Sequence, residues 1–229
     1  MFMRELTPNL PPCSAAQCRR LRQFCETAFE KFFTAKVVVS SNWARSGQTP
    51  VLRIHMFIEH LQREMAVCSY DEIEEFLARD SGRWQVVSIR EPDHPEAVLK
   101  DALKAHAVVF KDIFTGGEDL GPNAAHLEGI LRFVQRSENA PLLIQCWAGR
   151  SRSTAVALVI LVQSLWNKRI DGEEVVRSAV DELLKIRPVA APNRLVLRLG
   201  LEQFLPKELA STLAKALIME PCIRQKFFH

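Results

Sequence analysis

The seven residues from Cys146 to Arg152 combine residue types that could carry out phosphate chemistry. Cys146 offers a sulfur nucleophile. Arg152 offers a planar guanidinium that can hold two phosphate oxygens at once, which a lysine could not do. Gly149 permits unusual backbone dihedral angles and a close approach of the backbone to an anion. The intervening residues are expected to bind phosphate through their backbone N–H groups; they are Trp147, Ala148, Gly149, Arg150 and Ser151.

Two apolar elements flank this loop and are expected to position it. Residues 141–145 form an apolar run that is typical of a buried strand, and residues 153–166 carry apolar side chains at helical spacing. A loop that leads into a helix N-terminus gathers N–H groups and the positive end of the helix dipole, so it favours an anion. The same field favours the thiolate form of Cys146. The sequence therefore predicts a phosphate cradle with a nucleophile at its start.

The pattern Cys-x5-Arg-Ser, with a glycine three residues after the cysteine, resembles the signature loop of cysteine-dependent protein tyrosine phosphatases. Ala148-Gly149 and Ser151-Arg152-Ser153 are similar to the dual-specificity branch, and the wider pattern resembles bacterial predicted protein tyrosine phosphatases. The resemblance covers residues 65–205. It implies hydrolysis of phosphomonoesters through a phosphocysteine intermediate, without a metal or another cofactor. An incidental cysteine near an arginine would explain neither the glycine nor the loop length.

Phosphate ester hydrolysis also needs an acid for the leaving oxygen and a base for water. Asp112 is the candidate for both roles, because it lies just past the apolar segment 107–110 and 34 residues before Cys146. The resembled phosphatases place an aspartate after the corresponding strand. A lone aspartate more often caps a helix or lies in a loop, so Glu118 and Asp119 on the same glycine-rich segment are the alternative acids.

Two further residues are expected to support the loop. The hydroxyl of Ser153 could hydrogen-bond the Cys146 sulfur and stabilise it as a leaving group, or it could cap the following helix. Asn193 ends the segment Arg187-Pro188-x3-Pro192-Asn193, which is similar to an element that follows the signature in dual-specificity phosphatases. The resemblance implies that its amide braces the phosphate loop.

Gln145 departs from the resembled pattern, because these phosphatases usually carry a histidine directly before the cysteine. Glutamine can form hydrogen bonds but cannot carry a charge. One alternative is therefore a catalytically weak or inactive phosphate-binding protein. A sulfurtransferase or an arsenate reductase is a third possibility, but Arg152-Ser153 and the separate Asp112 argue against it. We favour an active enzyme, because Arg152, Ser153 and Asp112 are all present.

The sequence predicts the type of reaction more specifically than it predicts the substrate. Tyr70 is the only tyrosine, so the tyrosine-bearing recognition loop of classical tyrosine-specific enzymes is not evident. A basic residue at the position of Arg150 also occurs in relatives that act on phosphoinositides or phospholipid head groups. The simpler roles are packing for Trp147 and solvent exposure for Arg150. A phosphorylated protein or a small phosphomonoester is the expected partner, with lipid and other non-protein phosphates as alternatives.

The order of elements predicts an α/β fold with a mainly parallel central sheet flanked by helices. The resemblance implies that this fold is dual-specificity phosphatase-like. Strands are expected at 66–69, 84–89, 107–110 and 141–145, and helices at 71–79, 96–104, 122–136, 153–166, 172–186 and 193–204. Because sites in such sheets lie at the carboxyl ends of the strands, Cys146 and Asp112 should lie at one edge. We predict a catalytic domain at 65–205, a C-terminal tail at 206–229, and a mostly helical N-terminal extension of unknown role at 1–64, with helices at 19–35 and 51–64.

Composition excludes several classes of protein. The 229 residues are 48% hydrophobic and 25% charged, which is ordinary for a globular protein. No apolar run is long enough to span a bilayer, and the N-terminal residues lack the hydrophobic region of a signal peptide. The six cysteines suit neither a disulfide framework nor a zinc site, which favours a reducing location, the cytoplasm. The net charge is +4 over residues 1–64, −3 over 65–205 and +2 over 206–229, so we expect neither a nucleic acid nor a membrane as a partner.

Overall fold

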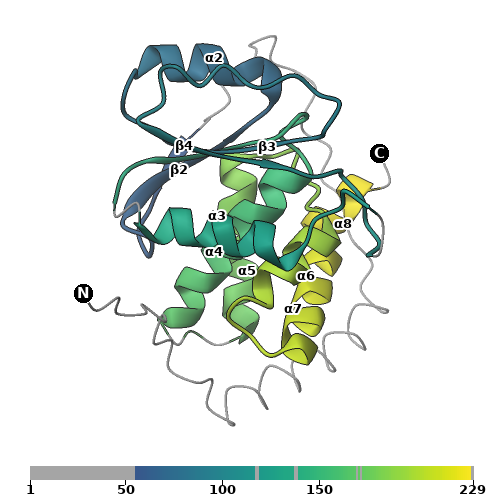
Figure 1. Cartoon of the computed structure of the whole chain (residues 1–229). Coiled ribbons are helices and arrows are strands. Elements are labelled where there is room, and N and C mark those ends of the chain that lie inside the picture. The colour runs from purple at the N-terminus through teal and green to yellow at the C-terminus, as the bar shows by residue number, and fades with distance from the viewer. Residues whose placement is uncertain (1–54, 117–118, 137–138, 169, 171, 228–229) are drawn as a thin grey trace, which may run out of the picture.

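The computed structural model describes residues 55–116, 119–136, 139–168, 170 and 172–227 (Figure 1). The helix predicted at 19–35 and most of the predicted N-terminal extension lie outside these residues. A five-stranded sheet has the order β1-β2-β5-β3-β4. Its strands are β1 (His55–Ile58), β2 (Arg63–Cys68), β3 (Gln85–Arg90), β4 (Lys104–Val109) and β5 (Leu142–Gln145).

The pairing of the strands confirms the predicted mainly parallel sheet. β5 pairs in parallel with β2 on one side and with β3 on the other, and β3 pairs in parallel with β4. Only β1 is antiparallel to its neighbour. As the central strand, β5 is buried along its whole length. The loop that follows it therefore starts from a fixed point in the middle of the sheet.

Helices cover the two faces of the sheet unequally (Figure 1). Of the helices that the structure describes, α2 (Tyr70–Arg79) is the one that covers the first face, whereas the larger core lies on the other. The remaining helices are α3 (Ala124–Arg136), α4 (Arg152–Asn167), α5 (Gly172–Ile186), α6 (Arg194–Leu201), α7 (Lys207–Met219) and the short α8 (Pro221–Arg224), which a 3-10 turn at Gln225–Phe227 follows. In α4, apolar side chains are buried on all sides, as expected for a central helix.

Two predicted helices are wrong. Residues 51–64 do not form a helix where they are described, because β1 and the start of β2 form a hairpin there. Residues 96–104 do not form one either, because their backbone groups pair with the chain before β3 instead. The Gly82 N–H donates to Asp101 O at 2.8 Å, and the Leu103 N–H donates to Trp84 O at 2.8 Å.

The C-terminal residues contribute to the main core. Leu209, Leu213 and Leu217 of α7 are buried with Ile223 of α8, and α7 packs against α6 and α5. Residues 207–227 are thus helical where a tail was predicted, and the division of the chain into domains stays a prediction. Among the helices of the described part of the chain, none is long and apolar enough to cross a membrane.

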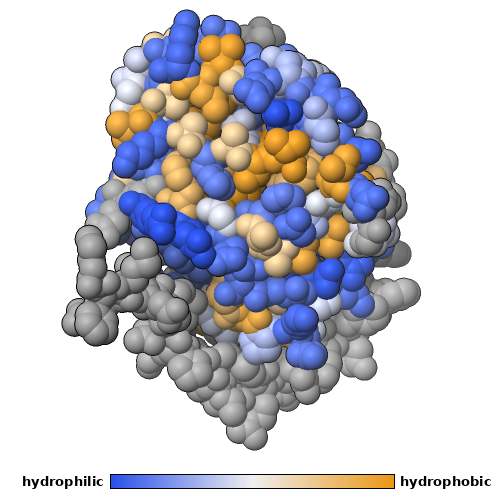
Figure 2. All heavy atoms as spheres, in the orientation of Figure 1, coloured by the Kyte–Doolittle hydropathy of each residue, from blue (hydrophilic) through white to orange (hydrophobic). Residues whose placement is uncertain are grey.

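The surface is mixed in polarity. In Figure 2, hydrophobic residues gather in patches over the sheet and above it, with hydrophilic residues around them. β4 forms one edge of this sheet, where Val109 and the preceding Leu103 are exposed.

Candidate active site

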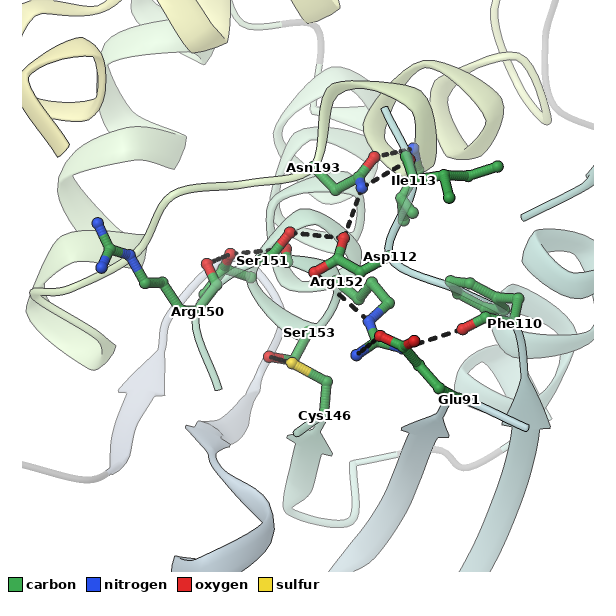
Figure 3. A network of polar contacts seen from close by, with 12 residues as sticks. Glu91, Phe110, Asp112, Ile113, Cys146, Arg150, Ser151, Arg152, Ser153 and Asn193 are labelled. Atoms are coloured by element: carbon green, nitrogen blue, oxygen red, sulfur yellow. Dashed lines mark hydrogen bonds and ion pairs between the residues drawn. The ribbon is translucent and has the colours of Figure 1, made fainter. Parts of the chain in front are cut away.

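Cys146 directly follows β5 and is almost fully buried, at 1% exposure. Its Sγ lies 3.0 Å from Oγ of Ser153, which is the second residue of α4 (Figure 3). Ser153 therefore makes the predicted contact with the sulfur. The N-cap residue of α4 is Ser151, whose hydroxyl donates a hydrogen bond to Asp112 and not to the helix.

Most backbone carbonyl groups of the loop are hydrogen-bonded to the surrounding chain, whereas its N–H groups are not, in the part of the chain that the structure describes. Within residues 147–151, four carbonyls accept hydrogen bonds from outside the loop: Trp147 O from Tyr70 N–H (2.9 Å), Gly149 O from Arg187 Nε (3.0 Å), Arg150 O from Ala191 N–H (2.8 Å) and Ser151 O from Asn193 N–H (3.2 Å). By contrast, the backbone N–H groups of residues 147–151 donate to no acceptor within the described residues. Five donors thus remain available for an anion.

Gly149 is the residue that lets this loop pass close to the sheet. Its φ is +60°, and a Cβ added there would lie 2.6 Å from both the carbonyl carbon of Cys68 and the nitrogen of Ser69. These are backbone atoms at the end of β2, so they cannot move aside as a flexible side chain would. Both the dihedral angle and the available space require glycine at this position.

We expect Gly149→Ala to lower the free energy of unfolding by about 3 kcal/mol, because strain at positive φ adds to overpacking. Thermal unfolding followed by circular dichroism would measure the change. Gly116→Ala is the matched control, because a Cβ at Gly116 meets no atom within 4 Å. An unchanged melting temperature for Gly149→Ala would show that the loop can relax.

Arg187 and Glu72 support the loop from behind. Arg187 is buried; its Nε donates to Gly149 O, and its Nη1 donates to Glu72 Oε1 at 3.0 Å. Glu72 also accepts from the Ser69 N–H at 2.7 Å. Burial acts to raise the pKa of the Glu72 carboxyl, but the hydrogen bonds from Arg187 and Ser69 outweigh it and lower that pKa. Glu72 was not among the predicted site residues.

Arg152 is 2% exposed and holds three partners in this structure. Its Nη1 donates to Phe110 O at 2.9 Å, its Nη2 lies 3.1 Å from Glu91 Oε1, and its Nε lies 3.7 Å from Asp112 Oδ2 (Figure 3). The buried Nε has no hydrogen-bond partner in the described part of the chain. Glu91 was also missed, although its place directly after β3 put it at the same sheet edge as Cys146.

The structure brings Asp112 to the phosphate loop. One carboxylate oxygen, Oδ1, accepts from Ser151 Oγ at 2.8 Å and from Asn193 Nδ2 at 2.7 Å. Of the alternative acids, Glu118 lies outside the described residues, and Asp119 is exposed with no contact to the loop among those described.

Asn193 joins the two loops of the site. Its Oδ1 accepts from the N–H groups of Leu195 and Val196 and so caps α6, at the position where the sequence predicts a helix to begin. Its Nδ2 donates to Asp112 and to Ile113 O, and its backbone N–H donates to Ser151 O. One buried side chain thus contacts the aspartate segment while its backbone holds the phosphate loop.

Gln145 makes two hydrogen bonds where the resembled pattern has a histidine. At 2% exposure, its Oε1 accepts from Ser88 Oγ at 2.8 Å, and its Nε2 donates to Cys146 O at 3.0 Å. The side chain is therefore fixed by Ser88 and by the backbone of Cys146, and it adds no charge beside the sulfur.

The two large side chains inside the loop point to different places. Trp147 is 42% exposed and contacts the rings of Tyr70 and His94. Arg150 points away from Cys146, and its Nη2 donates to Lys226 O at 2.6 Å (Figure 3). The Arg150 guanidinium is thus not turned toward Cys146 in this structure, and Ala148 is exposed as well. The phosphate contacts of both residues stay a prediction.

Comparison with known proteins gives similar structures only. No protein-family model and no curated protein matches the chain. It is similar to human DUSP28, at 25% identity over 72% of this chain and 92% of that chain, with a TM-score of 0.42. A mouse putative dual specificity phosphatase shares 20% identity over 79% and 98%, with a TM-score of 0.44. PTPMT1 in complex with PI(5)P shares 16% over 71% and 97%, with a TM-score of 0.45.

Proposed function

We propose that this chain is a cysteine-dependent phosphomonoester hydrolase of the protein tyrosine or dual-specificity phosphatase kind. One observation carries the proposal: five consecutive backbone N–H groups, in residues 147–151, follow Cys146 directly and have no acceptor in the described part of the chain. A phosphate group suits such a set of donors. Arg152, whose Nε makes no hydrogen bond within the described residues, adds a positive charge beside them.

In the first step the Cys146 thiolate attacks phosphorus, and the bond from phosphorus to the leaving oxygen breaks. Asp112 gives its proton to that oxygen, so an alcohol or phenol departs and a phosphocysteine remains. The loop N–H groups and Arg152 stabilise the charge on the three equatorial oxygens. Arg152 binds the phosphate by exchanging contacts with Glu91 and Phe110 for contacts with oxygens of the ester.

In the second step water attacks phosphorus, and the bond from sulfur to phosphorus breaks. The Asp112 carboxylate takes a proton from the water, and inorganic phosphate leaves. Ser153 donates a hydrogen bond to the thiolate as it forms; the 3.0 Å separation of Oγ and Sγ supports this role. The balance of both steps requires only the ester and water.

The partner that this chemistry requires is a phosphorylated protein or a small phosphomonoester. A thiolate nucleophile needs a reducing compartment, and the cytoplasm is the location we propose. The three cysteines that the structure describes, Cys68, Cys146 and Cys222, are all free thiols, which supports a reducing location.

We expect Asp112→Asn to lower kcat for para-nitrophenyl phosphate about a hundredfold, because the amide cannot transfer a proton. Initial rates with EDTA present would measure the loss, and the fall should be smaller for a substrate with a better leaving group. Asp119→Asn is the matched control, because Asp119 is exposed on the same segment. Equal losses in both variants would assign the acid elsewhere.

A phosphate-binding protein without turnover is the alternative, and the neutral Gln145 is the observation that favours it. We expect the wild type to hydrolyse para-nitrophenyl phosphate, and Gln145→His to alter an existing rate rather than create one. The same initial-rate measurement compares the two proteins. If the wild type is inert and Gln145→His hydrolyses the ester, the natural protein is a phosphate-binding protein and not a phosphatase.

A further inference from the structure

We infer that Trp147 is a specificity-determining residue, whose indole contacts the organic part of the substrate and favours leaving groups with a flat, apolar face. Tyr70 and His94 act as positioning residues for this indole. The inference rests on the proposed function, since it assumes that the loop holds the phosphate of an ester. It concerns the body of the substrate rather than its phosphate.

Three rings from separate parts of the chain meet beside the loop. The Trp147 ring lies 4.9 Å from the Tyr70 ring at an interplanar angle of 25° and 4.1 Å from the His94 ring at 32°. Tyr70 is the first residue of α2, and His94 lies in the segment after β3. Both rings are tilted only 25° and 32° from the plane of the indole, so they cover part of its surface while 42% of the Trp147 residue stays exposed.

The backbone around these rings is held in place. The Tyr70 N–H donates to Trp147 O, and the His94 N–H donates to Glu91 O at 3.2 Å. The carbonyl of His94 accepts from Arg90 Nη1 at 3.4 Å. Glu91 in turn pairs with Arg152. The indole is therefore ordered before a substrate arrives, and binding need not pay for that ordering.

The exposure of Trp147 argues against a purely structural role. A tryptophan that serves only to fill space is expected to be mostly buried, yet this one is 42% exposed although two rings contact it. Trp147 directly follows Cys146 in the chain, and the segment of His94 reaches the site through Glu91, which accepts from the His94 N–H and pairs with Arg152. An aromatic surface of this kind binds flat apolar groups by stacking.

The charged alternative is weaker at this loop. A polyanionic substrate would call for a second cation beside Arg152, and Arg150 is the candidate in the loop. Its guanidinium instead points away from Cys146 and contacts Lys226 O (Figure 3). The loop therefore offers an aromatic side chain, and not a second guanidinium, to the rest of the substrate.

The test compares two phosphomonoesters, 1-naphthyl phosphate and glycerol 2-phosphate, in the full-length protein. We expect Trp147→Ala to lower the ratio of kcat/KM for the naphthyl ester to that for the glycerol ester about tenfold. Trp147→Phe should recover most of the ratio. Inhibition by inorganic phosphate should change far less, because the indole does not contact the phosphate. Phe57→Ala, at a 49% exposed aromatic residue of β1, is the matched control and should leave the ratio as it is.

A binding measurement separates this inference from the proposed function. Calorimetry with naphthylmethylphosphonate and methylphosphonate, neither of which is hydrolysed, would report the preference even if the wild type turned over neither ester. If the wild type prefers naphthylmethylphosphonate, Trp147→Ala loses that preference and neither ester is hydrolysed, the inference holds and the proposed phosphatase activity is wrong. Equal losses for both ligands in Trp147→Ala, or tighter binding of an inositol polyphosphate that depends on Arg150, would overturn the inference.

Discussion

Replacing Cys146 with serine should lower the turnover of para-nitrophenyl phosphate by at least about a thousandfold. The serine hydroxyl is a far weaker nucleophile than a thiolate. Among the described residues, the hydrogen-bond partner of the sulfur is itself a hydroxyl, that of Ser153 at 3.0 Å, and a hydroxyl is a poor base for activating the serine. The loop N–H groups are untouched, so phosphate should still bind. Initial rates and calorimetry with inorganic phosphate would measure the two effects separately.

The other thiols provide the controls for this result. Cys222 is exposed on α8, and Cys222→Ser should retain wild-type turnover. Burial raises the pKa of the Cys68 thiol, so Cys68 stays neutral and is not a rival nucleophile. Turnover that survives in Cys146→Ser and disappears in Cys222→Ser would contradict the proposed mechanism.

Arg152→Lys should lower kcat/KM roughly a hundredfold to a thousandfold. Lysine keeps the positive charge but lacks the planar fork that holds two phosphate oxygens at once. Its ammonium also cannot reproduce the separate contacts of Nη1 with Phe110 O and of Nη2 with Glu91 in their present geometry. The measurement is steady-state hydrolysis of para-nitrophenyl phosphate at several concentrations.

The same loop contains the matched control for the arginine. Arg150→Lys changes an exposed side chain that points away from Cys146, so a much smaller effect is expected there. The melting temperatures of both variants should be compared, because Arg152 is buried and its replacement also removes structural contacts. Equal losses of kcat/KM in the two variants would rule out a special role for Arg152.

The central part of the fold could be predicted because its signals are local in sequence. The apolar run before Cys146 became β5, and the apolar spacing after Arg152 became α4. By contrast, β1 depends on its pairing with β2, which no local pattern in His55–Ile58 revealed. Helix α7 did carry a local signal, since Leu209, Leu213 and Leu217 recur at four-residue spacing.

The residues of the site also differ in whether a local stretch of sequence reveals them. The loop that includes Cys146 and Arg152 is continuous in sequence, so its position between β5 and α4 could be predicted, and its chemistry stays a proposal. Glu72 and Glu91 act through arginines that lie far from them along the chain, and only the folded arrangement of α2, β3 and the loop brings each pair together. The contact of Trp147 with Tyr70 and His94 also joins segments distant in sequence.

The position of Asn193 has a consequence for thermal motion. Because this residue is bonded both to Asp112 and to the carbonyl of Ser151, a displacement of one segment carries the other with it. Fluctuations of the two segments should therefore be correlated, and the separation between acid and phosphate should vary less than the position of either. Proton transfer depends on that relative separation. The reacting groups can thus keep their alignment while the surrounding surface moves.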